Sequence, residues 1–252
     1  MNDNFKKLKC LGYNVFNDKL NTIGVGKKLL INTINQYSFC IASKDNEFSN
    51  ALKQSDILLP DGIGIVAAAK LLKGEKIKKI AGADIHEFLL NKLNSEEGSC
   101  FYLGSSLDTL QKIEERLKKE YPKIRAGFHS PPYKPKFTEE DNTTMVNAVN
   151  EFKPDVLFVG MTAPKQEKWS FKNKSALDVQ IICSIGAVFD FYAGTMKRPN
   201  KIWINLGLEW FGRLIKEPKR MWKRYIYYGF IFLGHLAKAW FKKVLQKKSN
   251  FT

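Results

Sequence analysis

Apolar residues recur along this chain with two different spacings, which predict helices separated by buried strands. Spacings of three and four positions are typical of amphipathic helices. They predict helices over residues 27–35, 46–54, 61–72, 85–93, 107–119, 139–152 and 164–173. Short apolar runs between turn residues are typical of buried strands. They predict strands over residues 38–42, 57–59, 100–103, 123–128, 155–159 and 179–184.

The order of these segments predicts an α/β fold. After a hairpin expected near residues 14–20, strand, turn and helix alternate along most of the chain. This order favours a mostly parallel sheet with helices on both faces. A chain of 252 residues has room for one such domain and an appendage. We therefore predict a core over residues 1–195 and a helical, basic C-terminal appendage over residues 196–252.

The predicted appendage carries most of the positive charge of the chain. The net charge is +16, and the residues from Lys197 onward contain 14 Lys or Arg against two acids, which gives +12. The first 196 residues therefore contribute only +4. Basic residues interleaved with Trp in one segment indicate an anionic partner, which could be a phosphate, a nucleic acid or a membrane surface.

The last apolar run, over residues 225–241, is too short to span a membrane, because a spanning helix needs about 20 largely apolar residues. Aromatic residues followed by lysines favour an interfacial helix on anionic lipid. The alternative is a helix that docks on its own domain or in an interface between copies of the chain. The first ten residues lack the apolar run of a secretory signal, so we expect a cytoplasmic protein, peripheral on the inner face of the membrane.

The sequence predicts neither a metal site nor a bound cofactor. The four cysteines lie far apart without a C-x-x-C pair, and the three histidines are scattered. No Walker A or G-x-G-x-x-G motif is present, which disfavours a redox dinucleotide enzyme. No Asp-x-Asp motif is present either, so the charge of a diphosphate leaving group would fall to arginines, lysines or helix dipoles.

Unusual residues follow several predicted strands, at the edge where α/β sheets bind ligands. Asp61 comes after an apolar strand and a proline, and it is either the N-cap of a helix or a carboxylate placed to take a proton. Gly160 and Gly104 permit close backbone approach, and Pro164 suits a first helical turn whose free N–H groups attract anions. Gln166 suits the orientation of a sugar hydroxyl.

Five segments, in the same order, resemble the WecG/TagA/CpsF family of bacterial glycosyltransferases. They are LLPDGIGIV (58–66), KIAGADI (79–85), VGMTAPKQEKW (159–169), IGAVFDFYAGTMKRPNKIW (185–203) and LEWFGRLIKEPKRMWKRY (208–225). The resemblance covers nearly the whole chain and implies a Rossmann-like core whose appendage completes the site and contacts the membrane. It also implies inverting, metal-independent transfer of a sugar, often of the N-acetylmannosamine type, from a UDP-sugar to a polyprenyl-diphosphate-linked sugar.

The resemblance assigns roles to particular residues. Asp61, beside Gly62, would be the general base that deprotonates the acceptor hydroxyl, and Gln166 would orient substrate. The residues expected to bind the diphosphate or the nucleotide are Arg213, Arg220, Arg224, Tyr133 and Asp190. The family has Thr-x-Asn at the first strand end, where we expect Ser43 and Asp45 instead; Ser43 would join the catalytic set and Asp45 would contact substrate.

Two other functions compete with this one. The basic appendage would suit a nucleic-acid-binding protein, but no helix-turn-helix or RNA-binding signature is present and the strand-end motifs would have no role. A membrane adaptor without catalysis is the third hypothesis, which Asp45 favours and the retained Asp61 and Gln166 disfavour. We expect a sugar nucleotide, a lipid-linked acceptor and a membrane surface as partners, and no nucleic acid.

Overall fold

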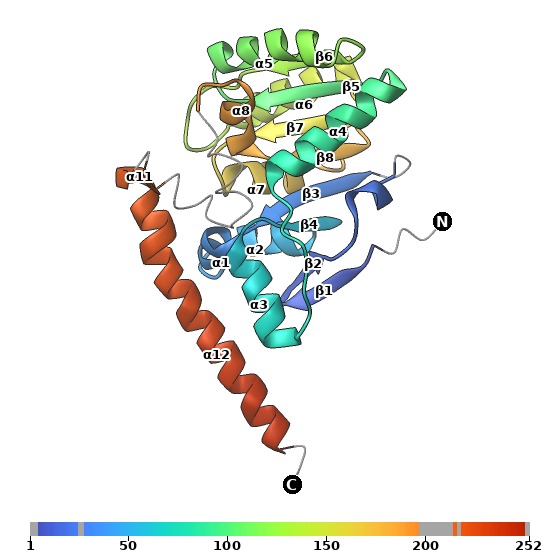
Figure 1. Cartoon of the computed structure of the whole chain (residues 1–252). Coiled ribbons are helices and arrows are strands. Elements are labelled where there is room, and N and C mark those ends of the chain that lie inside the picture. Colours follow the sequence, from blue (N-terminus) through green and yellow to red (C-terminus); the bar gives the residue numbers. More distant parts are fainter. Residues whose placement is uncertain (1–4, 25–27, 197–213, 216–217, 250–252) are drawn as a thin grey trace.

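A six-stranded parallel sheet forms the centre of the protein (Figure 1). The computed structural model describes residues 5–24, 28–196, 214–215 and 218–249. Within them the strands stand in the order β4-β3-β8-β7-β5-β6, and every neighbouring pair is parallel. The strands are β3 (Leu29–Ile34), β4 (Ile57–Pro60), β5 (Ser99–Gly104), β6 (Arg125–His129), β7 (Val156–Gly160) and β8 (Ile181–Ser184).

Helices cover both faces of this sheet, because successive strand side chains point to opposite sides. On one face Tyr102 and Phe158 pack with residues of α4, α5 and α8, and on the other Phe101 and Leu157 pack with residues of α6 and α7. The helices are α1 (Gln36–Ala42), α2 (Asn46–Lys53), α3 (Ile63–Lys73), α4 (Gly82–Glu96), α5 (Leu107–Glu120), α6 (Glu139–Phe152), α7 (Lys165–Asn173) and α8 (Gly186–Tyr192). The predicted α/β architecture, Rossmann-like with a parallel sheet, is confirmed.

The hairpin lies closer to the N-terminus than predicted. Strands β1 (Lys7–Cys10) and β2 (Tyr13–Phe16) pair antiparallel around a turn of Leu11 and Gly12, both at positive φ. A short 3-10 turn, η1 (Leu20–Thr22), follows.

The first strand and the first helix of the sheet domain are the reverse of the prediction. Residues 29–34, predicted as helix, form β3, and residues 38–42, predicted as strand, lie in α1. Helix α1 starts where Asn35 and Ser38 form a capping box, each side chain binding the backbone N–H of the other. The first strand end is therefore Thr33-Ile34-Asn35.

Ser43 and Asp45 consequently do not stand at a strand end, as predicted. Ser43 ends α1 and donates its hydroxyl to the Cys40 carbonyl at 2.8 Å. Asp45 caps α2 by accepting from the Phe48 N–H at 3.0 Å, and it forms an ion pair with Lys168 of α7 at 2.7 Å. Ser43 therefore stabilises the end of α1 and Asp45 joins α2 to α7, and neither is among the residues that line the cleft described below.

The described part of the C-terminal appendage is helical, as predicted. It contains α11 (Pro218–Trp222), a π-helical turn η2 (Lys223–Tyr227) and α12 (Tyr228–Ser249). In Figure 1, α12 runs from α11 past α1 and α3 to the C-terminus. Its Phe232 and Leu236 are buried among residues of α1 and α3, and the Phe232 ring meets Phe39 edge to face at 5.5 Å. Among the described helices, none combines the length and the apolar character needed to cross a bilayer.

Candidate active site

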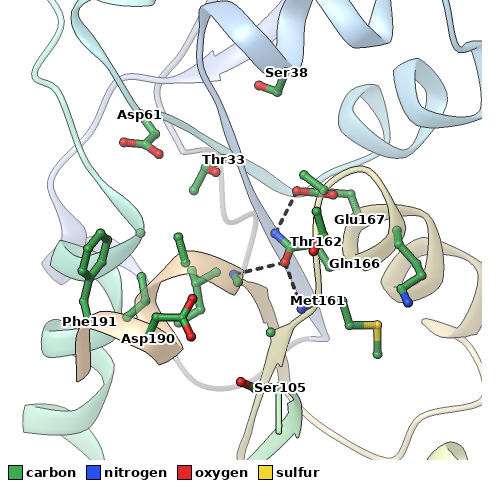
Figure 2. A pocket seen from close by; sticks show the side chains of 18 of the residues that line it. Thr33, Ser38, Asp61, Ser105, Met161, Thr162, Gln166, Glu167, Asp190 and Phe191 are labelled. Carbon is green, nitrogen blue, oxygen red and sulfur yellow. Dashed lines mark hydrogen bonds between the residues drawn. The ribbon is translucent and has the colours of Figure 1, made fainter. Parts of the chain in front are cut away.

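A cleft of about 910 Å³ opens at the carboxyl edge of the sheet. Residues that follow β3, β4, β5, β6, β7 and β8 line it, and Arg224 and Tyr225 of the C-terminal helices close one side. Figure 2 shows side chains from several of these strand ends converging on the cleft. The position agrees with the general rule that parallel α/β sheets bind ligands beyond their carboxyl ends.

Three glycines bring the strand ends of the cleft floor together. A Cβ on Gly104 would lie 2.2 Å from the carbonyl oxygen of Gly160, its register partner on β7. A Cβ on Gly160 would lie 2.4 Å from the Phe189 ring, and one on Gly186 would lie 2.4 Å from Gln166 Oε1. Such distances leave no room for any side chain, so glycine is required for the packing of these strand ends.

Gln166 joins two of these strand ends. Its Oε1 accepts hydrogen bonds from the backbone N–H groups of Met161, after β7, at 3.2 Å and of Gly186, after β8, at 3.1 Å. Its Nε2 donates to Glu167 Oε1 at 2.9 Å. Gln166, which we expected to orient substrate, makes these three hydrogen bonds within the protein and fixes the shape of the cleft.

Glu167 is a buried carboxyl group on the wall of the cleft. Its side chain is 3% exposed, and burial raises its pKa from 4.5 to about 7. Oε1 accepts from Gln166, whereas Oε2 has no hydrogen-bond partner within the described residues. Glu167 lies in the VGMTAPKQEKW segment that carries the family resemblance, but we did not predict a role for it.

Asp61 lies on the edge strand side of the cleft, directly after β4. Its backbone N–H donates to the Ile34 carbonyl at 2.9 Å, which extends the pairing of β3 and β4 by one residue. The N-cap of α3 is Gly62, at φ +126°, and not Asp61. The capping alternative for Asp61 is therefore wrong, and its carboxylate lines the cleft instead.

The junction of β3 and α1 adds polar groups that the sequence analysis missed. Thr33, Asn35, Gln36 and Ser38 line the cleft between Asp61 and the α7 side, and Gln36 Oε1 is buried without a hydrogen-bond partner in the described part of the chain. A Cβ on Gly62 would lie 3.2 Å from this oxygen, so the glycine lets α3 approach α1 closely. The helical spacing assigned to residues 27–35 hid these positions.

Cations border the cleft on two sides. The Arg224 guanidinium lies over the Tyr37 ring, 4.8 Å from its centroid, and both residues line the cleft. Lys165 donates to the Lys134 carbonyl at 3.0 Å and lies over the Phe137 ring, and burial lowers its pKa. Arg213 and the side chain of Arg220 lie outside the described residues, so their predicted contact with a diphosphate stays a prediction.

The two residues that we expect at the nucleotide both line the cleft. Tyr133 is fully exposed, in the loop after β6 that Ser130 ties to the Ser105 carbonyl at 2.7 Å. Asp190 lies on α8, after β8. Gly104 and Pro164 do not line the cleft themselves. The next residues in the chain, Ser105 and Lys165, line it instead.

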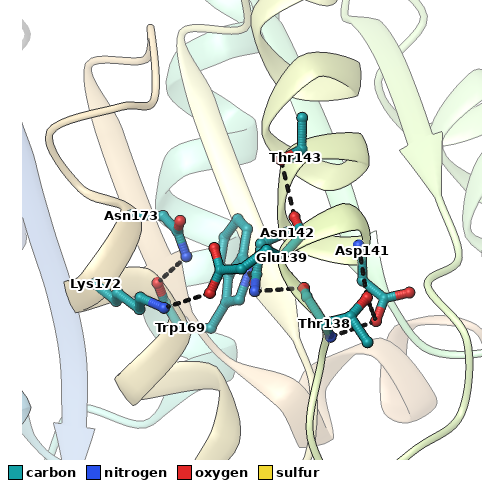
Figure 3. A network of polar contacts seen from close by, with 8 residues as sticks. All are labelled: Thr138, Glu139, Asp141, Asn142, Thr143, Trp169, Lys172 and Asn173. Carbon is teal, nitrogen blue, oxygen red and sulfur yellow. Dashed lines mark hydrogen bonds and ion pairs between the residues drawn. The ribbon is translucent and has the colours of Figure 1, made fainter.

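A polar network on the outer side of α7 supports this wall of the cleft (Figure 3). Trp169 of α7 donates from Nε1 to Asn142 of α6 at 2.9 Å, and Lys172 pairs with Glu139 at 3.2 Å. Thr138 and Asp141 form the capping box that starts α6. The part-buried Trp169–Asn142 hydrogen bond fixes α7, and with it Gln166 and Glu167, whereas the exposed Lys172–Glu139 pair adds little. Within the described ranges no cluster of three His, Cys, Asp or Glu has the arrangement of metal ligands.

Comparison with known proteins identifies the family. Residues 6–246 match the glycosyl transferase WecG/TagA/CpsF family. A Bacillus subtilis (strain 168) protein named N-acetylglucosaminyldiphosphoundecaprenol N-acetyl-beta-D-mannosaminyltransferase is 32% identical over 77% of this chain and 74% of its own length. Proteins of the same name from Bacillus spizizenii and Staphylococcus aureus (strain MW2) are 29% and 26% identical, over 73% and 77% of this chain and 69% and 74% of their own lengths. The chain therefore belongs to the WecG/TagA/CpsF family of glycosyl transferases.

Proposed function

We propose that this glycosyltransferase moves an N-acetylmannosamine-type sugar from a UDP-sugar to a polyprenyl-diphosphate-linked sugar, with inversion and without a metal. The observation that carries the proposal is the cleft, which Asp61, the hydroxyl-bearing β3 end and Arg224 all line. The names of the relatives specify both the sugar type and the lipid-linked acceptor.

In the proposed reaction, Asp61 takes the proton of the acceptor hydroxyl as its oxygen attacks the anomeric carbon of the donor. The bond between that carbon and the diphosphate oxygen breaks, and its electron pair leaves with UDP. A single displacement of this kind inverts the anomeric centre. Arg224 is placed to stabilise the charge that develops on UDP, and Arg213 and Arg220 belong to the same proposal.

The exposed side of α12 supports attachment to a membrane surface. Apolar side chains that are more than a third exposed recur mostly at spacings of three and four: Trp222 of α11, Ile226 of η2, and Phe230, Leu233, Phe241 and Leu245 of α12. Phe232 and Leu236, which pack on the core, point the other way. Exposed lysines at positions 238, 242 and 243 flank the apolar side. We propose that this face lies on the anionic inner leaflet, next to the lipid-linked acceptor.

The direct test is a transfer assay with Asp61→Asn. The protein is incubated with UDP-N-acetylmannosamine and a lipid-diphosphate N-acetylglucosamine, with and without a chelator, and the product is identified by mass. We expect transfer by the wild type in both conditions, and a loss of about 10²- to 10⁴-fold in Asp61→Asn with unchanged UDP binding.

Two results would count against the proposal. Near wild-type transfer by Asp61→Asn would remove Asp61 from the reaction as its base. Salt-sensitive binding to DNA without any binding of UDP would favour the nucleic-acid hypothesis.

A further inference from the structure

We propose that Glu167 recognises a sugar substrate, through an oxygen that accepts a hydrogen bond from a hydroxyl or amide N–H group on the ring. The inference rests on the proposed function and adds to it a residue that contacts the sugar and not the diphosphate. Neither the family match nor the names of the relatives assign a role to this position.

Glu167 Oε2 is a hydrogen-bond acceptor that has no donor within the described residues. Glu167 is 3% exposed, and its Oε2 has no hydrogen-bond partner among the described residues although the side chain lines the cleft. A buried carboxyl oxygen without a donor is costly, and native proteins rarely retain one. A ligand that brings a donor into the cleft would satisfy it.

The Glu167 carboxyl group is held in place before any ligand arrives. Gln166 Nε2 binds Glu167 Oε1 at 2.9 Å, and Gln166 Oε1 is itself held by the backbone N–H groups of Met161 and Gly186. The carboxyl group is therefore fixed to the ends of β7 and β8, as Figure 2 shows. A preorganised acceptor loses little entropy on binding.

Buried acceptor oxygens in the cleft indicate a ligand that carries hydrogen-bond donors. Gln36 Oε1, at the start of α1, belongs to another residue that lines the cleft and is a second buried acceptor without a partner in the described residues. Phosphate oxygens are themselves acceptors and carry negative charge, so the Glu167 carboxylate, when ionised, disfavours the diphosphate at this position. A sugar ring presents several O–H and N–H donors. The part of the substrate beside Glu167 is therefore a sugar.

Arg224 does not satisfy this carboxyl group. Its guanidinium lowers the pKa of Glu167 only as the weakest of several influences, and it stacks on Tyr37. No ion pair joins Arg224 to Glu167 in the described part of the chain. Both residues line the cleft, so the sugar and the diphosphate would bind in the same cleft.

The test compares Glu167→Gln and Glu167→Ala with the wild type in two arms. One arm measures by calorimetry the affinity for UDP and for UDP-N-acetylmannosamine, and the other measures KM and kcat with the lipid-linked acceptor. In Glu167→Gln the amide oxygen is needed by Gln166 Nε2, so an NH₂ group replaces the acceptor that faces the cleft. We expect the affinity for UDP to be unchanged. Sugar binding should weaken by about 10- to 100-fold, either in the affinity for UDP-N-acetylmannosamine or in the KM for the lipid-linked acceptor.

The arm that changes tells whether Glu167 contacts the donor sugar or the acceptor sugar. Deoxy and deacetylated analogues of that sugar then locate the contact, because the analogue without the partner group should bind wild type and Glu167→Ala equally. Glu139→Gln is the matched control: it removes a carboxylate beside α7 that pairs with Lys172 outside the cleft, and it should behave as wild type. Thermal unfolding of each variant verifies that it is folded.

Wild-type behaviour of both Glu167 variants in both arms would overturn the inference and leave the proposed function intact. Failure of the wild type to bind UDP-sugar or to transfer would instead contradict the proposed function. The two failures are therefore distinguishable.

Discussion

Gly104, Gly160 and Gly186 show how single residues set the shape of the cleft floor. At each position an added Cβ would lie 2.2 to 2.4 Å from a neighbouring atom. From the sequence we predicted that Gly104 and Gly160 permit close backbone approach. The close neighbours are parts of the protein itself: the Gly160 carbonyl at Gly104, the Phe189 ring at Gly160, and Gln166 at Gly186. This packing leaves Ser105, Met161 and Ala187 in the cleft wall.

At the same scale, the buried carboxyl of Glu167 makes stability depend on pH. Its pKa is about 7 in the folded state against 4.5 normally, so between these values the unfolded chain releases a proton that the folded chain keeps. Stability contributed by the neutral carboxyl is present below pH 4.5 and is lost as the pH rises through 7. A shift of this size corresponds to about 3 kcal/mol.

We therefore expect Glu167→Gln to be more stable than the wild type at pH 8, by up to about 3 kcal/mol, and similar to it near pH 4.5. Urea unfolding at both pH values measures the difference. Glu139→Gln, at an exposed ion pair, should show little change at either pH. A constant difference between Glu167→Gln and wild type across this range would contradict the assignment.

At the scale of elements, most helices and strands were predictable, and the exceptions have a physical cause. The run from residue 29 to 34 is mostly apolar and buried on both sides because β3 is an interior parallel strand, and such a run matches a helical spacing as well as a strand. The Asn35 and Ser38 capping box was the signal that could have separated the two. With β3 assigned, Thr33-Ile34-Asn35 matches the Thr-x-Asn that the family resemblance implies, so the supposed departure at Ser43 and Asp45 disappears.

The two sides of α12 lead to a prediction for this element. Replacement of Phe230, Phe241 and Leu245 by Ser removes exposed apolar surface, so binding to anionic vesicles should fall by about 10²-fold or more. The Tm should change little, because these side chains do not pack on the core. Vesicle sedimentation and thermal unfolding measure both quantities.

The same triple variant tests the alternative for α12. If it still binds vesicles but has a smaller mass in solution, the exposed side of α12 is an interface between copies of the chain. Phe232→Ser on the buried side is the matched comparison, and it should lower the Tm.

At the scale of the whole molecule, the C-terminal helices contact both the core and the cleft. Phe232 and Leu236 fill a cluster with α1 and α3, Cys40 donates to the Tyr228 carbonyl at 3.6 Å, and Arg224 lines the cleft on the preceding turn. The family resemblance implied the connection to the cleft through Arg224, and docking on the core was the alternative to a membrane helix; the residues that dock were not predicted. Charge and hydropathy indicated a basic appendage, whereas the contacts that dock it lie about 190 residues apart in the chain.

Truncation after Thr195 should therefore affect stability as well as activity. Loss of the buried Phe232 and Leu236 side chains should destabilise the remaining core by about 3–6 kcal/mol. Arg224→Ala in the full chain should keep most of the stability and lower transfer by about 10²-fold. Thermal unfolding and the transfer assay measure the two effects. Full activity of the truncated core on a soluble acceptor would contradict a role for the appendage in the site.

The continuity between Arg224 and the exposed side of α12 has a kinetic consequence. If one helix both rests on the bilayer and closes the cleft, the enzyme meets its acceptor by diffusion in two dimensions. The rate should then follow the mole fraction of acceptor in the surface, and added inert lipid should slow turnover even when the bulk concentration of acceptor is constant. The apparent KM of such an enzyme is a surface density.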